Sequence, residues 1–265
     1  MDNRAIGFFD SGLGGLTSVP VLKHALPNEK VLYFGDTART PYGSKSPDTV
    51  CKFSAQIVDY LVSKNVKLIV IACNTVTAMA LDMLRERHPE VPIVGVIDPT
   101  ARRVSVDGVS NVGIIGTKVT IESGVYAESI HSLNPDINTY SLACPAFVPL
   151  IEEGIIDNEI MDLTIKYYMD DFVKNNNIDS LILGCTHYPL IATNIKRLYP
   201  ELKLYNSSAE VICDVVDILT EKDMLAGEND FPDRFYASDL SENFLRMTDT
   251  LFEGYDTKIK LKKLD

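Results

Sequence analysis

The sequence predicts an α/β fold in which parallel strands alternate with helices. Short apolar or β-branched segments alternate along the chain with longer segments whose apolar residues have helical spacing, a pattern typical of βαβ units. Runs that are apolar at every position, such as 68–71, are expected where helices cover both faces of a sheet. Strands are predicted at 5–9, 31–34, 68–72, 93–96, 112–115, 139–142, 181–183 and 234–237, and segment 258–263 alternates like an edge strand with exposed lysines.

The helices between these strands are predicted from the spacing of their apolar residues. Segment 48–63 repeats apolar residues at helical spacing, and Asn65 follows it as a stop signal. Thr17 is expected to cap an earlier helix, whose first turn tolerates Pro20. Further helices are predicted at 77–87, 122–132, 158–175, 190–198, 209–219 and 242–252.

Two pairs of segments repeat at nearly the same spacing. Segment 5–11 resembles 111–117, and segment 68–75 resembles 180–187. The repeat predicts two pseudo-symmetric parallel-sheet α/β domains, with an active site in the cleft between them. We expect the first domain to comprise residues 1–97 and 207–265, and the second to comprise residues 98–206.

Composition and charge exclude several classes of protein. The chain has 265 residues, of which 46% are hydrophobic, and this is enough for a core that needs no disulfide or metal. Its net charge of −12 argues against binding nucleic acid or anionic lipid. No apolar run reaches the roughly 18 residues of a membrane span, and residues 1–4 do not resemble the start of a signal peptide. We therefore expect a soluble, cytoplasmic protein, and its five widely spaced cysteines do not suggest a disulfide framework.

Cys73 and Cys185 occupy equivalent places, each directly after a buried predicted strand. Open α/β sheets bind ligands at the carboxyl ends of their strands, and helix N-termini at those ends favour a thiolate. A single cysteine after an apolar run is usually buried filler, but two equivalent cysteines can face each other across a cleft. One thiolate can then remove a proton from a stereocentre while the opposite thiol protonates the other face, which inverts the centre without a cofactor.

Each thiol needs a polar neighbour to ionise, because an unperturbed thiol has a pKa of about 8.5. Asp10 ends the first predicted strand and His187 lies two residues after Cys185, so both are candidates. A turn or capping role for Asp10 and a structural role for His187 stay open at this point. The side chains that can both cap the neighbouring helices and donate to a ligand are Asn74, Thr75 and Thr186.

The glycine-rich segment 10–17 is not a dinucleotide-binding fingerprint, because Thr17 stands where the third glycine is needed. Its glycines are expected to let the backbone approach a small ligand to which Ser11 donates. A second loop, 41–44, follows the second strand at the same edge, and an ordinary turn is its alternative interpretation.

Together these segments resemble the glutamate racemases of the cofactor-independent aspartate/glutamate racemase superfamily. The resemblance covers nearly the whole chain and is carried by six motifs in order: 9–17, 41–44, 72–75, 116–120, 144–152 and 184–190. The departures are Ala146, where the family often has a larger apolar residue, and Pro20 in the first helix.

The resemblance implies interconversion of L- and D-glutamate, which supplies D-glutamate for peptidoglycan, with no cofactor and no metal. Cys73 would act on the D enantiomer with help from Asp10, and Cys185 on the L enantiomer with help from His187. The α-amino and α-carboxylate groups would be held by Asp10, Ser11, Asn74, Thr75 and Thr186, and the side-chain carboxylate by the loop with Tyr42 and Gly43. Further pocket residues implied by the resemblance are Thr117, Thr120 and Glu152.

The resemblance also implies a homodimer that binds a small-molecule substrate. The absence of nucleic-acid and membrane partners is expected from the net charge and the lack of long apolar runs. Constitutive activity is expected, because few residues precede the first predicted strand and members activated by a cell-wall precursor carry a longer extension there.

Two other functions stay open on the sequence. A racemase for another substrate such as aspartate would need the same two thiols, although segment 184–190 favours glutamate. A zinc site formed by Asp10, Cys73, Cys185 and His187 is conceivable, but no paired spacing pre-organises these ligands. A second, non-enzymatic interaction of the acidic surface is also possible.

Overall fold

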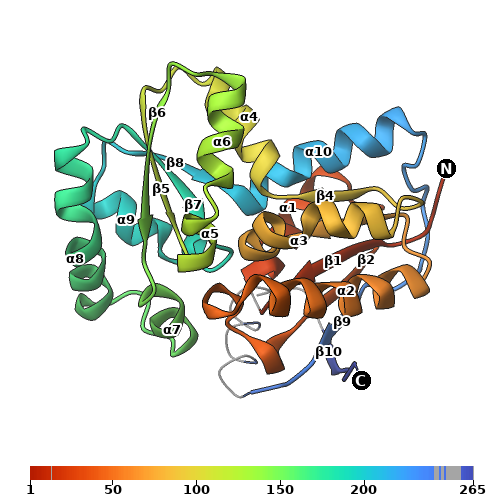
Figure 1. Cartoon of the computed structure of the whole chain (residues 1–265). Helices are drawn as coiled ribbons and strands as arrows, with labels where there is room; N and C mark the ends of the chain where they lie inside the picture. The colour runs from red at the N-terminus through yellow and green to blue at the C-terminus, as the bar shows by residue number, and fades with distance from the viewer. Residues whose placement is uncertain (13, 242–244, 246–247, 249–257, 265) are drawn as a thin grey trace.

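The computed structural model describes residues 1–12, 14–241, 245, 248 and 258–264, and the chain forms two lobes that meet side by side (Figure 1). Within these residues the first lobe contains a six-stranded sheet in the order β10-β9-β2-β1-β3-β4, and all of its neighbouring strands are parallel. Its strands are β1 (Ile6–Asp10), β2 (Val31–Gly35), β3 (Leu68–Ile71), β4 (Ile93–Gly95), β9 (Arg234–Ala237) and β10 (Ile259–Leu261).

The second lobe contains a parallel sheet whose described strands have the order β6-β5-β7-β8. The order β2-β1-β3-β4 of the first lobe thus recurs, with β5 equivalent to β1 and β7 equivalent to β3. This confirms the predicted α/β fold with two pseudo-symmetric parallel sheets. The strands are β5 (Asn111–Gly116), β6 (Asn138–Ala143), β7 (Ser180–Gly184) and β8 (Lys203–Asn206).

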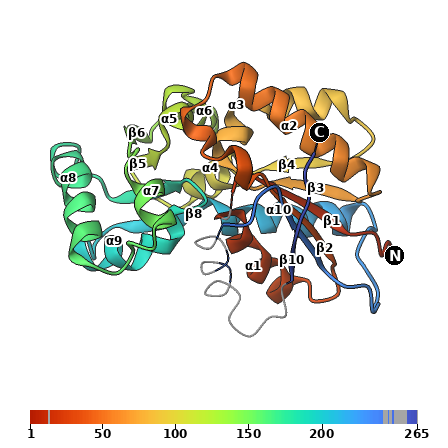
Figure 2. The same cartoon turned by 90° about the horizontal axis from the view of Figure 1, so that it is seen from below.

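Helices cover both faces of the first sheet, as the view from below shows (Figure 2). Phe8 and Val70 point to the face that packs against α1 and α10, whereas Phe9 and Ile71 point to the face that packs against α2 and α3. Burial on both faces explains why these strands are apolar at every position. The helices are α1 (Ser18–Ala25), α2 (Pro47–Ser63), α3 (Asn74–Arg87) and α10 (Ser207–Glu221).

The second sheet is covered in the same way. Ile114 and Ile182 pack against α4 and α6, while Ile115 and Leu183 belong to the core that includes α8 and α9. No helix in the described ranges combines the length and apolar character needed to cross a membrane. The helices of this lobe are α4 (Ile97–Val106), α5 (Lys118–Glu122), α6 (Val125–Leu133), α7 (Phe147–Glu152), α8 (Glu159–Asn175) and α9 (Ala192–Leu198).

Two local predictions about helix ends are wrong. The predicted helix 122–132 is broken where α5 ends and α6 begins, because Gly124 adopts a left-handed backbone with φ of 72°. Thr17 does not cap α1 with its side chain: its backbone is helical and its hydroxyl donates to the carbonyl of Gly14, 2.6 Å away. Residues 14–17 form a short 3₁₀ helix that leads into α1, and this helix replaces the expected cap.

The remaining element predictions have mixed outcomes. The first two residues of the predicted helix 190–198 belong to a 3₁₀ helix, Tyr188–Ile191, and α9 begins at Ala192. β8 was not predicted, because only two of its four residues are apolar. Asn65 does follow the end of α2, with φ of 57°, and β10 is an edge strand. The predicted helix 242–252 lies almost entirely on residues that the structure does not describe.

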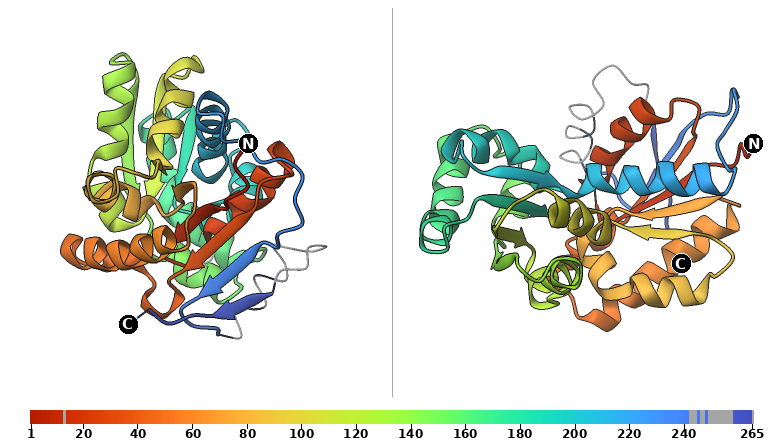
Figure 3. Two further views of the ribbon diagram at one scale, coloured as in Figure 1. Left: turned by 90° about the vertical axis from the view of Figure 1, so that its right-hand side faces the viewer. Right: turned by 90° about the horizontal axis from the view of Figure 1, so that it is seen from above.

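The chain passes from the second lobe back to the first close to the predicted domain boundary. The chain leaves the second sheet at the end of β8 and enters α10, which packs against α1 of the first lobe. The view from above shows α10 running along the first lobe (Figure 3). We therefore propose domains of residues 1–97 plus 207–265 and of residues 98–206.

A buried ion pair ties the amino ends of the first sheet to the segment after α10. The side chains of Lys67 and Glu29 are 0% and 2% exposed, and Lys67 Nζ lies 2.7 Å from Glu29 Oε2. Lys67 also donates to the carbonyls of Asp2 and Met224, and Glu29 accepts from the backbone N–H of Ala226. Removing one charge would leave the other buried without compensation, which is more costly than losing a surface pair.

We expect Lys67→Met to lower the free energy of unfolding by about 3–5 kcal/mol, because Glu29 keeps its buried charge and loses its partner. Urea unfolding followed by circular dichroism measures this change. Lys52→Met is the control: it removes the same charge from an exposed position of α2, and we expect a change within about 0.5 kcal/mol. A loss below about 1 kcal/mol for Lys67→Met would contradict this account of the ion pair.

Candidate active site

The carboxyl ends of the central strands of both sheets meet at one small cavity. β7 ends directly before Cys185, β3 ends two residues before Cys73, and both cysteines line the cavity. The cavity is about 20 Å³, which is room for about one water molecule. Its lining consists of Ser11, Thr40, Pro41, Tyr42, Gly43, Cys73, Asn74, Thr75, Thr117, Val148, Gly184, Cys185, Thr186 and His187.

Cys73 lies at the start of α3, and its thiol is held in the protonated form. Its Sγ is 3.3 Å from the hydroxyl oxygen of Ser11. Burial raises the pKa of the Cys73 thiol to about 12, and the nearby negative charge of Asp10 adds to this effect. The hydrogen bonds with the Ser11 hydroxyl and with the backbone of Val76 lower the pKa of Cys73 but do not outweigh burial.

Asp10 lies behind the cavity wall and is fully buried. Its Oδ2 accepts the backbone N–H groups of Gly12 and Gly15 at 3.1 and 3.0 Å, and its Oδ1 accepts the hydroxyl of Thr186 at 3.4 Å. Burial raises the pKa of Asp10, whereas the charge of His187 and the backbone N–H groups lower it. Asp10 thus connects the first lobe to the loop that follows Cys185 in the second lobe.

The glycines of segment 10–17 are needed for close contact between protein groups. A Cβ at Gly14 would lie 2.4 Å from the carbonyl carbon of Thr186, and one at Gly15 would lie 2.6 Å from Cβ of Asp10. Our expectation that these glycines make room for a ligand is therefore corrected for both positions: they let the first lobe pack against Thr186 and against Asp10 itself.

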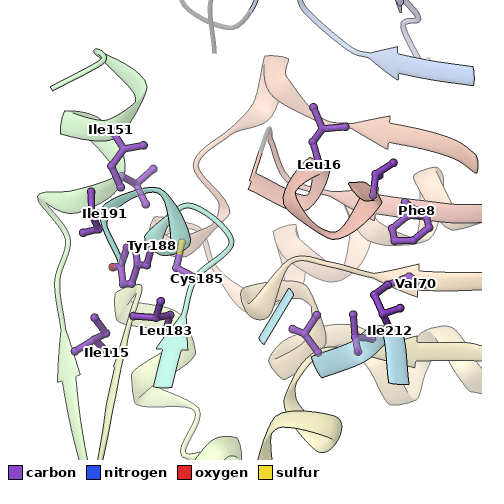
Figure 4. Close-up of a cluster of buried hydrophobic side chains, with 14 of the residues drawn as sticks. Phe8, Leu16, Val70, Ile115, Ile151, Leu183, Cys185, Tyr188, Ile191 and Ile212 are labelled. Atoms are coloured by element: carbon purple, nitrogen blue, oxygen red, sulfur yellow. The ribbon is translucent and has the colours of Figure 1, made fainter. Parts of the chain in front are cut away.

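Cys185 has a cationic neighbour that Cys73 lacks. Its Sγ lies 3.8 Å from Nδ1 of His187, and Nε2 of His187 lies 3.2 Å from Glu152 Oε1 on α7. Burial alone lowers the pKa of His187, but hydrogen bonds and negative charge from Cys185 and Glu152 outweigh burial and raise it to about 10. Figure 4 shows the Cys185 side chain next to Tyr188, within the apolar core of the second lobe.

Three threonine hydroxyls join the lobes on the other side of the cavity. Thr75 Oγ1 at the start of α3 lies 3.0 Å from Thr117 Oγ1 and 3.1 Å from Thr120 Oγ1, and the latter two are 3.0 Å apart. A Cβ at Gly43 would lie 2.4 Å from Cβ of Thr117. The loop with Gly43 therefore packs directly on the second lobe.

The predicted site residues occupy three kinds of position. Asp10 and Thr120 are buried behind the lining and bonded to it, and Glu152 reaches the cavity through His187. The lining itself contains Ser11, Tyr42, Gly43, Cys73, Asn74, Thr75, Thr117, Cys185, Thr186 and His187. Among the residues that the structure describes, no group of three His, Cys, Asp or Glu side chains could hold a metal ion.

Two residues that support the site, Asp36 and Tyr126, were not identified from the sequence. Asp36 accepts hydrogen bonds from Tyr42, Arg39 and Ser238 and so holds the loop that contains Gly43. Asp36 directly follows β2. A polar residue at the carboxyl end of a predicted strand is a sequence signal that could have identified Asp36 as a site residue. Tyr126 donates to Asn74 from α6, and no sequence pattern connects these two residues.

Comparison with known proteins places these features in context. The model of the Asp/Glu/hydantoin racemase family matches residues 19–216 of this chain. A protein of Geobacter metallireducens named glutamate racemase is 43% identical over 95% of this chain and 93% of its own length. A glutamate racemase of a Sulfurihydrogenibium species is 50% identical over 78% of this chain and 80% of its own length.

Solved structures give the same picture. The crystal structure of glutamate racemase from Francisella tularensis in complex with D-glutamate has a TM-score of 0.93 and 40% sequence identity to this chain. The match covers 100% of this chain and 99% of that one. The chain thus shares the whole fold, and both lobes, with a structure that contains D-glutamate.

We expect the imidazole of His187 to stay protonated up to about pH 10, because Cys185 and Glu152 stabilise its charge. NMR titration of histidine-labelled protein measures this value. Glu152→Gln removes one of the two negative neighbours and is expected to lower the midpoint by about one pH unit or more. The exposed His24 serves as internal reference in the same spectra. A midpoint near 6.5 for His187 would show that its two neighbours do not act as described.

Proposed function

The chain belongs to the Asp/Glu/hydantoin racemase family and is a racemase, and we propose that it interconverts L- and D-glutamate through two cysteine thiols without a cofactor. The observation that carries this proposal is the position of Cys73 and Cys185. They follow equivalent strands of two pseudo-symmetric sheets and line a single cavity. A substrate held between them presents opposite faces of its Cα to the two thiols, which is the geometry that inversion requires.

Glutamate is the proposed substrate because of the relatives. The two sequence relatives, 43% and 50% identical, are named glutamate racemase, and the Francisella tularensis structure was solved with D-glutamate. The cavity lining offers neutral donors for an amino acid with two carboxylates. We assign the α-amino and α-carboxylate groups to Asp10, Ser11, Asn74, Thr75 and Thr186, and the side-chain carboxylate to Tyr42 and Gly43.

The ionisation of the site explains how the reaction starts from L-glutamate. His187 is a cation at neutral pH and lies beside Cys185, while Cys73 keeps its proton. In the proposed step, the Cys185 thiolate removes the Cα proton of L-glutamate, and the Cys73 thiol delivers its proton to the opposite face. The product is D-glutamate, with Cys185 now a thiol and Cys73 a thiolate.

The reverse reaction uses the same groups in the opposite order. The Cys73 thiolate removes the Cα proton of D-glutamate and the Cys185 thiol protonates the other face. We propose that Asp10 assists Cys73 and that His187, held by Glu152, assists Cys185. Thr117 and Thr120 would support the pocket through their hydrogen bonds to Thr75.

Entry of the substrate requires the lobes to separate. A cavity of about 20 Å³ does not hold an amino acid of ten non-hydrogen atoms. The contacts that close it include hydrogen bonds between side chains of the two lobes: Thr75 with Thr117 and Thr120, Thr186 with Asp10, and Tyr126 with Asn74. Each hydrogen bond between neutral groups contributes only about 1 kcal/mol.

The cellular role follows from the same relationship. We propose that D-glutamate made by this protein supplies peptidoglycan synthesis in the cytoplasm and that the protein acts as a homodimer. Ile160, Leu163 and Tyr167 lie on one face of α8 and are each more than half exposed, which makes this face a candidate for the contact between subunits.

We expect Cys73→Ala and Cys185→Ala each to lower racemisation in both directions by at least about 10²–10⁴-fold, because each inversion needs one base and one acid. Circular dichroism of L- and D-glutamate incubated with the chelator-treated protein in D₂O measures loss of optical signal, and NMR measures deuterium at Cα.

The exposed Cys213 provides the matched control. Cys213→Ala should keep the full rate, since this residue lies on α10 outside the cavity lining. Full racemisation by either single variant at the site would exclude the two-thiol mechanism. Turnover of aspartate with none of glutamate would leave the fold and mechanism in place and reject glutamate as substrate.

A further inference from the structure

Tyr126 is a buried residue of the second lobe whose hydroxyl bonds to a side chain of the cavity in the first lobe. We propose that Tyr126 is a positioning residue for Asn74: it fixes the direction of the Asn74 amide so that an N–H of that amide faces the substrate. This inference rests on the proposed function, in which Asn74 binds the α-carboxylate or α-amino end of glutamate.

The hydrogen bonds around the amide leave it a single orientation. Tyr126 is 2% exposed, and its hydroxyl lies 2.5 Å from Asn74 Oδ1. Asn74 Nδ2 donates to the hydroxyl of Ser207, 3.3 Å away. The oxygen of the amide thus points to Tyr126 and its nitrogen points to Ser207.

The donor of each hydrogen bond in the network around Asn74 is also determined. Ser207 donates its own hydrogen to the carbonyl of Leu183, and Thr100, which lies beside the Tyr126 hydroxyl, donates to the carbonyl of Val96. Neither hydroxyl hydrogen is left for Asn74 Oδ1, and Tyr126 must therefore supply it. Burial raises the pKa of Tyr126, so that its hydroxyl keeps the donated hydrogen across the working pH range.

One hydrogen of the Asn74 amide remains unassigned by these contacts. A primary amide carries two N–H donors and one carbonyl acceptor, and Ser207 takes only one of the donors. Because Asn74 lines the cavity, the second N–H is the one available to a ligand. If the amide turned over, its carbonyl oxygen would face a substrate carboxylate instead and repel it.

The position of Tyr126 also connects this amide to the other thiol. A Cβ at Gly184 would lie 3.4 Å from Cε2 of the Tyr126 ring, and Gly184 immediately precedes Cys185. The ring therefore packs at the end of β7 while its hydroxyl reaches across to α3. Asn74 is correctly oriented only when the two lobes are together, which couples substrate binding to their closure.

The test is a double-mutant cycle on racemisation of glutamate. We expect Tyr126→Phe, which keeps the ring and removes only the hydroxyl, to raise KM for both enantiomers about tenfold while kcat changes less than about threefold, as for loss of uniform binding. In an Asn74→Ala background, the same substitution should change KM by less than about twofold, because it acts through the amide. Ser207→Ala, which removes the other anchor of the amide, should also raise KM.

Tyr205→Phe is the matched control. Tyr205 is also 2% exposed, belongs to the same apolar cluster and loses a comparable hydrogen bond, the one to Asp107 Oδ2 at 3.0 Å. We expect its KM to equal that of the unmodified protein, and thermal unfolding of both variants shows the purely structural effect.

Three results would overturn the inference. An unchanged KM in Tyr126→Phe would show that the hydroxyl does not position the amide. An equal effect of Tyr126→Phe with and without Asn74 would show that Tyr126 acts independently of it. Failure of the unmodified protein to racemise any amino acid would reject the proposed function and this role with it. If the protein racemises aspartate alone, the same double-mutant cycle is measured with aspartate as the substrate.

Discussion

The removal of water from two thiols between facing strand ends is the constraint on which the site depends. Cys73 and Cys185 are 5% and 7% exposed, and burial disfavours the charged form of a thiol. The mechanism that we propose needs one of them ionised and the other protonated. Their surroundings differ in charge: Asp10 puts negative charge near Cys73, and the His187 cation lies beside Cys185. The two lobes thus have similar backbones but place opposite charges next to their two thiols.

Close approach of the lobes makes this exclusion of water possible. Gly14 packs against the backbone of Thr186, and Gly43 packs against Thr117, with no space for a Cβ at either place. The polar contacts between the lobes around the cavity use threonine hydroxyls, the Asn74 amide and the buried Asp10 carboxylate. Under the proposed function, these contacts would break and form again around a small ligand.

The cavity lining offers the acidic substrate that we propose hydrogen-bond donors rather than fixed lysine or arginine charges. Within the described residues, the cavity lining contains no lysine or arginine, and His187 is its cationic side chain. Under the proposed function, hydroxyl, amide and backbone N–H groups would hold the carboxylates of either enantiomer by hydrogen bonds. Their orientation is maintained by residues one layer further out, Asp36 for the loop with Gly43 and Tyr126 for Asn74.

The sequence by itself determined the α/β class, the duplicated sheet, and Cys73 and Cys185 at equivalent strand ends. These properties depend on local apolar patterns and on a repeat, both of which are read along the chain. Only the tertiary structure decided that Gly14 and Gly15 serve contacts within the protein, that α5 and α6 are separate helices, and that β8 completes the second sheet. It also brought Tyr126 to Asn74 across the two lobes and Glu152 to His187 within the second lobe, because side-chain contacts between residues far apart in sequence leave no periodic signal.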